Sequence, residues 1–173
     1  MPLYLIELKP AEATKESVGA LIEKVVSAVG SSDGELIETQ VTSDHRIVFV
    51  VVEADSPRFA SPVVKAVEGS AEIAGPDEVR LVGAELDDIK KLKAHADYLV
   101  EWDIPAEITM DQYLARRKAN SPKYAEVPEV SFLRTYVRED TAKCLCFYDA
   151  PDEDAVTRAR AAVQTPIDRL FKL

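Results

Sequence analysis

An internal repeat constrains the fold of this chain more than any other feature of its sequence. Residues 4–8, with the sequence YLIEL, are echoed by residues 98–102, with the sequence YLVEW. A second pair follows, because PAEAT at residues 10–14 is echoed by PAEIT at residues 105–109. From residue 4 to residue 98 the offset is 94 residues, and from residue 10 to residue 105 it is 95, so one inserted residue reconciles the two pairs. Ordered matches at a nearly constant offset predict that the chain is a duplication of one folding unit.

Both halves show the same order of predicted elements. Thr14, Thr109 and Asp152 stand where helices should begin, because their side-chain oxygens can accept hydrogen bonds from free amide groups. In the first half we expect a strand at residues 3–9, a helix from Thr14 to Gly30, a hairpin over residues 35–53, a short helix at residues 56–67 and a strand at residues 78–83. In the second half we expect strands at residues 98–104, 130–138, 143–148 and 167–173, with helices at residues 110–120 and 153–163.

This order of elements predicts the fold class. The chain divides into a first unit at residues 1–86, a second unit at residues 97–173 and a polar linker at residues 87–96. Four strands and two helices in this order form an antiparallel sheet with both helices on one face, which is the ferredoxin-like βαββαβ unit. Because the other sheet face is left bare, two units can close sheet against sheet. The prediction is an α+β fold of tandem duplicated ferredoxin-like units that form a pseudo-dimeric α+β barrel. Such a chain would suffice as a monomer, and a homodimer also stays open.

Composition excludes several classes of partner. The chain of 173 residues carries a formal net charge of −10, and its basic clusters at residues 90–93 and 116–118 are short, so we expect no nucleic-acid partner. It has no run of about 18 apolar residues, so we expect no membrane partner. The N-terminal residues are typical of a first strand, and two cysteines only two positions apart suit a reducing cytoplasm.

Strand alternation indicates candidate ligand-binding residues. Successive strand residues face opposite sides of a sheet, so polar residues two apart share a face. Glu101 and Asp103 share a face opposite Trp102, and Glu7 holds the position equivalent to Glu101 in the first half. Alternation puts Phe132, Arg134 and Tyr136 on one face of the next strand, and Cys146 and Tyr148 on one face of the strand after it. The predicted ligand-binding residues are Glu7, Glu101, Asp103, Arg134, Tyr136, Cys146 and Tyr148.

A structural interpretation of the same residues is also open. Polar side chains on one face of an antiparallel sheet commonly face solvent. If two sheets closed on each other, an ion pair between Arg134 and a carboxylate would satisfy both groups without any binding function.

Five segments of the second half carry a resemblance to a known family. They are YLVE at residues 98–101, IPAEIT at 104–109, TYVRED at 135–140, CFYDAPDE at 146–153 and TPIDRL at 165–170. From residue 95 to the C-terminus the chain resembles a family of small bacterial ferredoxin-fold proteins that includes an actinomycete nickel-binding protein. The resemblance implies a ferredoxin-like fold, assembly as a dimeric barrel, and nickel as a ligand. The first half resembles a diverged copy that lacks the cysteines and the APDE segment.

The residues themselves give nickel less support. Nickel prefers imidazole and thiolate ligands, and the chain has His45 at a predicted turn and His95 in the predicted linker, neither spaced to share a face with another good ligand. Cys144 and Cys146 could ligate a soft metal, but a buried strand cysteine more often packs as a small hydrophobic residue. No cofactor is therefore determined by the sequence, and nickel is the candidate that the resemblance implies.

Two functions from different classes follow, because none of the common catalytic motifs is present. The first is a small-ligand or metal-binding protein with a pocket between the two antiparallel sheets. The second is a cofactor-independent enzyme of the isomerase, cyclase or monooxygenase type, with Glu101 as general base and Arg134 holding an anionic substrate or enolate. An interaction or structural role is the third alternative. We expect the principal site in the second half, because only that half keeps Arg134, Tyr136 and Cys146.

Overall fold

The structure of the protein is a computed structural model that describes residues 1–92 and 95–173. The described chain forms two compact units, of which the first contains residues 1–79 and 87–92 and the second contains residues 80–86 and 95–173. Within the described residues, no helix is long and apolar enough to cross a membrane.

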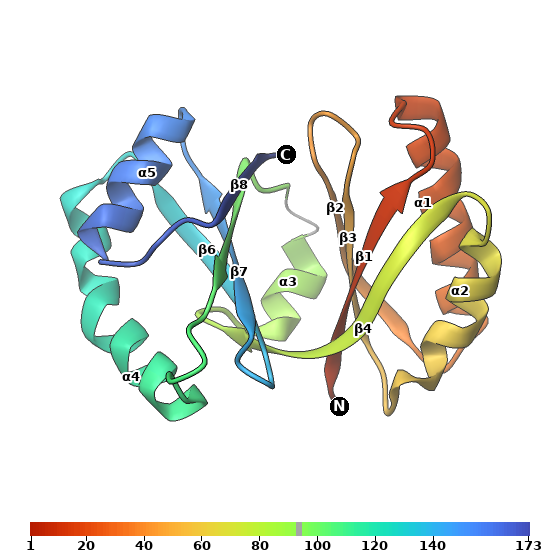
Figure 1. The fold of residues 1–173 in the computed structure, drawn as a ribbon, viewed down its shortest axis with the longest axis horizontal. Coiled ribbons are helices and arrows are strands. Elements are labelled where there is room, and N and C mark those ends of the chain that lie inside the picture. Colours follow the sequence, from red (N-terminus) through yellow and green to blue (C-terminus); the bar gives the residue numbers. More distant parts are fainter. Residues whose placement is uncertain (93–94) are drawn as a thin grey trace. The chain divides into compact units, whose positions relative to one another are not determined.

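The first unit has four strands and two principal helices (Figure 1). In chain order the elements are β1 (Leu3–Pro10), α1 (Lys15–Gly30), β2 (Glu35–Val41), β3 (Val48–Glu53), a 3-10 turn at Pro57–Phe59, α2 (Ala60–Val67) and β4 (Ala71–Val82). The strands lie in the order β2-β3-β1-β4 and pair antiparallel. Both helices cover one face of this sheet, and apolar side chains of that face pack against them as the core.

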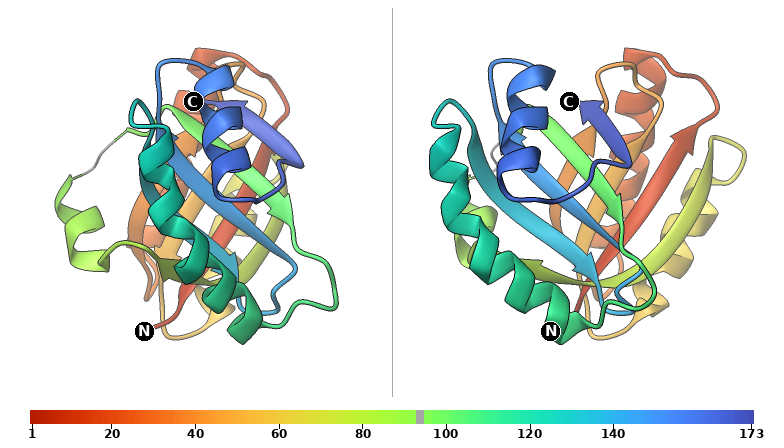
Figure 2. Two further views of the ribbon diagram at one scale, coloured as in Figure 1. Left: turned by 90° about the vertical axis from the view of Figure 1, so that its left-hand side faces the viewer. Right: turned by 60° about the vertical axis from the view of Figure 1, so that its left-hand side comes forward.

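The second unit repeats this arrangement. Its elements are β5 (Tyr98–Asp103), α4 (Met110–Asn120), a 3-10 turn at Ser121–Glu126, β6 (Ser131–Arg138), β7 (Lys143–Asp149), α5 (Glu153–Ala162) and β8 (Arg169–Lys172). The strand order is β6-β7-β5-β8, which is the order of the first unit with each strand replaced by its repeat counterpart. Figure 2 shows α4 and α5 on the same face of this sheet. The identical topology confirms the duplication of ferredoxin-like units.

Helix caps explain where the helices begin. Thr14 accepts a hydrogen bond from the Ser17 amide, and Asp152 accepts one from the Ala155 amide. Thr109 forms a reciprocal capping box with Gln112, in which each side chain bonds the backbone amide of the other residue. The three predicted caps are confirmed.

Two stretches of the first half differ from the prediction. The closing strand begins at Ala71, well before the predicted residue 78. The predicted linker at residues 87–96 contains helix α3, Leu86–Leu92, while residues 93 and 94 lie outside the described part of the chain. This helix is held by the buried side chain of Ile89 and by Lys90, whose Nζ lies 3.0 Å from a Glu53 carboxylate oxygen.

A β-bulge in β6 changes which side chains share a face. The pairing of β6 with β7 shifts between Phe132 and Arg134, so the alternation restarts after the bulge. Phe132 lies opposite Tyr148 and joins the core beneath the helices, whereas Arg134 lies opposite Phe147 on the other face. The predicted common face for Phe132 and Arg134 is therefore wrong.

Two glycines provide a matched test of this architecture. Gly83 has a φ of 85°, and a methyl group there would come within 2.6 Å of the Phe132 ring and also meet Arg117. Gly19 is exposed in α1, and a methyl group would meet nothing within 4 Å. We expect Gly83→Ala to lower the free energy of unfolding by more than about 1 kcal/mol, and Gly19→Ala to raise it by up to about 1 kcal/mol. Urea unfolding of both variants measures this, and shifts in the same direction would contradict the described backbone.

Candidate functional site

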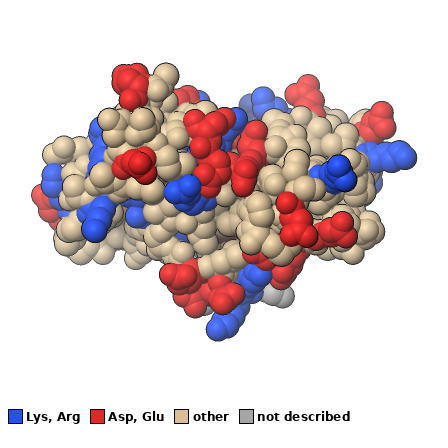
Figure 3. Space-filling view, turned by 90° about the horizontal axis from the view of Figure 1, so that it is seen from below, with Lys and Arg blue, Asp and Glu red and all other residues tan. Residues whose placement is uncertain are grey.

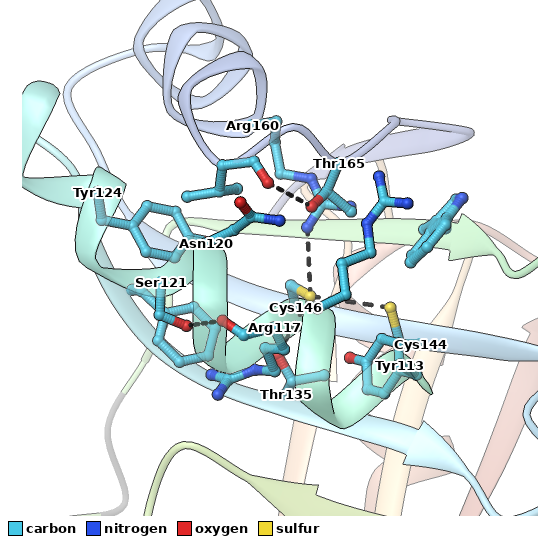
Figure 4. Close-up of a pocket in the computed structure, with 14 residues that line it drawn as sticks. Tyr113, Arg117, Asn120, Ser121, Tyr124, Thr135, Cys144, Cys146, Arg160 and Thr165 are labelled. Carbon is cyan, nitrogen blue, oxygen red and sulfur yellow. Dashed lines mark hydrogen bonds between the residues drawn. The ribbon is translucent and has the colours of Figure 1, made fainter. Parts of the chain in front are cut away.

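A small pocket opens into the second unit between its sheet and the helices that cover it (Figure 4). Its walls come from β5, β6 and β7, from α4 and the turn that follows it, and from α5 and the segment after it. The space inside measures about 30 Å³, which holds one or two water molecules. The lining residues are Trp102, Tyr113, Arg116, Arg117, Asn120, Ser121, Tyr124, Phe132, Thr135, Cys144, Cys146, Arg160, Val163 and Thr165.

The sulfur of Cys146 is the centre of the polar contacts in this pocket. Thr135, its pairing partner on β6, donates its hydroxyl to Sγ at 3.1 Å, and Nη1 of Arg160 donates at 3.4 Å. Sγ of Cys144, two residues along the same strand, lies 4.0 Å away (Figure 4). The hydrogen bond from Cys144 and the charge of Arg160 outweigh burial and lower the pKa of the Cys146 thiol to about 5. The same hydrogen bond and burial raise the pKa of Cys144. Cys146 is therefore a thiolate at neutral pH and Cys144 a thiol.

Arg160 is a buried cation whose described partners include no carboxylate. Arg160 is 3% exposed. Nη1 also donates to the Tyr148 hydroxyl at 3.1 Å, Nη2 donates to the Pro166 carbonyl at 2.6 Å, and Nε has no hydrogen-bond partner within the described chain. Burial alone would lower the pKa of Arg160, but the negative charge on Cys146 raises it. A buried charge needs a partner of opposite sign, so the Cys146 thiolate is the counter-charge of Arg160.

Two further arginines from α4 line the same pocket. The guanidinium of Arg117 lies over the Phe132 ring at 4.6 Å, and that of Arg116 lies over the Trp102 ring at 5.4 Å. Arg116 also donates to the Gln164 carbonyl at 2.5 Å. Carboxylates are absent from the described lining, so the pocket carries an excess of positive charge even with Cys146 ionised.

The predicted ligand-binding residues fall into separate places. Cys146 and Tyr148 lie on the helix-covered face of the second sheet, and Tyr148 joins the Arg160 network and bonds the Tyr124 hydroxyl at 2.6 Å. The other members from the second half share the opposite face, and Glu7 belongs to the first unit. The set on the opposite face is Glu101, Asp103, Arg134 and Tyr136.

On that opposite face Glu101 is held by cations. It is 3% exposed, and its carboxylate oxygens lie 2.6 Å from Nζ of Lys143 and 3.3 Å from Nε of Arg169. Arg169 also pairs with Asp103 and thereby lowers the pKa of that carboxyl. Arg134 stacks over the Phe147 ring at 4.6 Å. Two cations of the same unit therefore neutralise the charge of Glu101, while its buried Oε2 has no hydrogen bond within the described chain.

The prediction from sequence missed Arg160 and Thr135. Arg160 lies on the buried side of α5 with Val156, Ala159 and Val163, which are four, one and three residues from it, respectively. A charged residue inside such an apolar stripe is a signal that was available in the sequence. Thr135 could be assigned only with the position of the bulge, which no periodicity in β6 indicates.

The repeated strand order, with helices on one face of each sheet, defines a protein of tandem ferredoxin-like α+β units. The model of the family described as "Nickel responsive protein SCO4226-like" matches residues 98–173. The predicted resemblance of the second half to this family is confirmed. No match was found among curated proteins.

Several solved structures are similar to this chain. SCO4226 from Streptomyces coelicolor A3(2) is 18% identical over 45% of this chain and 95% of its own, with a TM-score of 0.39. TA0507, a candidate chlorite dismutase, is 14% identical over 100% of this chain and 91% of its own, with a TM-score of 0.54. Chlorite dismutase from Candidatus Nitrospira defluvii is 11% identical over 97% of this chain and 87% of its own, with a TM-score of 0.51. At such identities the likeness concerns the fold alone. The likeness over nearly the whole chain confirms the predicted α+β class of duplicated ferredoxin-like units.

Thiolate absorbance tests the ionisation of Cys146. In the folded protein we expect one thiolate to appear with a midpoint near pH 5, because Cys144 and Arg160 hold the pKa of Cys146 at about 5. Since this pKa is below its ordinary value, the thiolate stabilises the fold fully above about pH 8.5, and that stability is lost as the pH falls through 5.

Two arginine variants control the titration. Arg160→Met should move the midpoint upward, whereas Arg158→Met, at an exposed position of the same helix, should leave it in place. A midpoint near pH 8.5 in the unmodified protein would rule out the ion pair.

Proposed function

We propose that the protein binds a small ligand in the pocket of its second unit and that the bound part of the ligand is anionic. The observation that carries this proposal is the presence of three guanidinium groups in one pocket whose described lining contains no carboxylate. The chain as a whole is acidic, with a net charge of −10, and Figure 3 shows acidic side chains interspersed with basic ones over the face that it draws. A local excess of positive charge on an acidic protein favours a negative ligand.

Arg160, the buried one of the three arginines, supports the proposal most directly. Removing the Arg160 guanidinium from water, to 3% exposure, carries a large desolvation free energy. In the described structure one negative group, the Cys146 thiolate, lies within hydrogen-bond distance of this cation. Its Nε has a hydrogen to donate and no described acceptor. Unsatisfied buried donors are rare in proteins, and such a donor commonly marks the place of a ligand or an ordered water.

The first unit shows that the fold does not require these groups. Strand pairing makes Val50 the counterpart of Cys146, because Val50 lies opposite Ile6 on β1 and Cys146 lies opposite Val100 on β5. The first unit packs an ordinary apolar core at this place. The charged cluster of the second unit is therefore better explained by binding than by folding.

The dimensions of the pocket limit the ligand. A space of about 30 Å³ holds an anionic group of a few atoms, such as a carboxylate. A longer ligand would extend toward solvent beside Arg116. This lining residue is exposed, and its guanidinium lies over the Trp102 ring. The aromatic rings of Trp102 and Phe132 fit an apolar portion of such a ligand.

The other predicted functions find less support in the described contacts. The described residues contain no group of three or more His, Cys, Asp and Glu side chains placed to hold a metal ion, so they do not fit nickel, and the sulfur of Cys146 is already in contact with a guanidinium. For the enzyme hypothesis, Glu101 as a base would first have to be released from Lys143 and Arg169. Ligand binding on the face of Glu101, Asp103, Arg134 and Tyr136, and by Glu7, stays a prediction, as does a homodimer.

Thermal unfolding with sodium formate tests the proposal, with sodium chloride at equal ionic strength as the reference. A ligand at ten times its dissociation constant stabilises the folded state by about 1.4 kcal/mol, which raises the midpoint of a chain of this size by roughly 3–6 °C. We expect this shift in the unmodified protein and its loss in Arg117→Gln, because Arg117 contributes charge to the pocket without a described ion pair.

Arg158→Gln is the matched control for this experiment. Arg158 is an exposed arginine that pairs with Glu129 and Asp154 away from the pocket, so its replacement should leave the formate shift unchanged. Equal midpoints in formate and chloride, repeated with acetate, would count against an anion site.

A further inference from the structure

Two cysteines of β7 lie side by side against the pocket, and anion binding does not account for them. Cys144 and Cys146 are both buried free thiols, and both line the pocket. We propose that they form an oxidisable pair in which Cys146 attacks a small hydroperoxide and Cys144 resolves the product as a disulfide. This inference goes beyond ligand binding, because it assigns a chemical reaction to the site and does not require that an anion binds.

The contacts of Cys146 suit a nucleophile that reduces a peroxide. Thr135 and Arg160 place two hydrogen-bond donors at its sulfur, at 3.1 and 3.4 Å. Donors and a positive charge at this position stabilise the thiolate and also the negative charge that develops on the departing oxygen. Arg160 has a second donor, Nε, that no described group occupies.

The size of the pocket selects the class of oxidant. Cys146 is 4% exposed and is reached through a space of about 30 Å³. Hydrogen peroxide, with two heavy atoms, fits this space, whereas a bulky disulfide or organic oxidant does not. Buried structural thiols are ordinarily inert, but this one lies on the wall of a pocket.

Cys144 is placed to complete the reaction. Its sulfur lies 4.0 Å from that of Cys146. Residues two apart on a strand have Cα atoms roughly 6.4–6.8 Å apart, and disulfides span Cα separations of about 4.4–6.8 Å. The Cα separation lies at the upper limit of that range, so bonding of the two sulfurs requires side-chain rotation and a local adjustment of the β7 backbone.

The chemistry proceeds in two balanced steps. In the first, the Cys146 thiolate attacks the terminal oxygen of the hydroperoxide, the O–O bond breaks, and the sulfur is oxidised by two electrons to a sulfenic acid. The leaving alkoxide or hydroxide takes a proton from solvent. In the second, the sulfur of Cys144 attacks the sulfur of the sulfenic acid, the S–O bond breaks, and the released hydroxide takes the thiol proton and leaves as water.

Mass spectrometry of the whole protein tests the proposal. The folded chain is treated with hydrogen peroxide at pH 6, and the products are mapped by proteolysis without reduction. We expect the loss of two hydrogens and a peptide that carries a Cys144–Cys146 disulfide, reversed by dithiothreitol. Cys144→Val should instead accumulate a sulfenic acid at Cys146, which dimedone traps, and Cys146→Val should give neither product.

Valine is the replacement that the chain itself offers, because Val48 and Val50 occupy the matching positions of the first unit. Cys144→Val removes the hydrogen bond between Cys144 and Cys146 but leaves the contacts of Cys146 with Thr135 and Arg160 in place, so the variant should react more slowly and is given a longer exposure to peroxide. This variant therefore keeps the test decisive even if Cys146→Val folds poorly.

The rate gives a second readout that a structural role would not change. At pH 6 a thiol of pKa about 5 is mostly ionised, whereas an unfolded thiol of pKa about 8.5 is roughly 0.3% ionised. The lower nucleophilicity of the more acidic thiol removes part of this advantage, so the folded protein should react roughly tenfold faster than the same chain in urea. Arg160→Met should lose this acceleration and shift its pH profile upward, whereas Arg158→Met should keep both.

Two results would overturn the proposal. One is a folded protein that reacts no faster than the chain in urea. The other is oxygen added at Met1 or Met110 while both cysteines stay free thiols. These results are distinct from a failure of formate to stabilise the protein, which would remove the proposed anion site and leave the thiol chemistry intact.

Discussion

The ion pair between Arg160 and the Cys146 thiolate is the interaction on which the interior of the second unit depends. A guanidinium at 3% exposure cannot lose its proton at any ordinary pH, so the protein must surround it with acceptors. The structure supplies a thiolate, the Tyr148 hydroxyl and the Pro166 carbonyl. The first two groups belong to β7 and the third belongs to the segment that leads into β8, so Arg160 ties α5 to both. The cation thus organises the pocket and sets the ionisation of the thiol within it.

The first unit of the duplicated chain shows the same fold without this interaction. At the positions of Cys144, Cys146 and Tyr148 the first unit has Val48, Val50 and Val52, as the pairing of β3 with β1 and of β7 with β5 shows. Both units nevertheless have the same strand order. The βαββαβ topology is thus compatible with a wholly apolar centre. Polar groups in the second centre carry a desolvation cost that the first unit avoids, so a role in binding or reaction accounts for their presence better than a role in folding.

The sequence was sufficient for the architecture and for part of the site. The repeat and the caps at Thr14, Thr109 and Asp152 are readable from the sequence, and the structure confirms them. The missed helix α3 lies in a stretch rich in charged residues, and Ile89 is buried within it. Such a composition does not exclude a helix that is held by apolar packing and an ion pair.

The grouping of the site residues needed information that the sequence does not contain. Cys146 and Glu101 both carry polar groups on neighbouring strands, but Cys146 pairs with Val100 and therefore shares the face of Val100. Alternation within a strand divides its residues between two faces. It does not determine which of these two sets lies on the same face of the sheet as a given set of the neighbouring strand. That match depends on register, and in β6 the bulge before Arg134 alters it once more. The pocket could thus be assembled only after the pairing of the strands was known.

The two proposals for the pocket are coupled through the same guanidinium. An anion beside Arg160 would place a second negative charge near Cys146, and a like charge disfavours the ionised form of a thiol. Bound anion would therefore raise the pKa of Cys146 and reduce the fraction of thiolate. Because linkage is reciprocal, oxidation of Cys146 to a neutral disulfide would leave Arg160 without its counter-charge and strengthen its attraction for an anionic ligand. A site that holds one buried cation between a thiolate and an external anion thus links the redox state of the protein to its affinity for that anion.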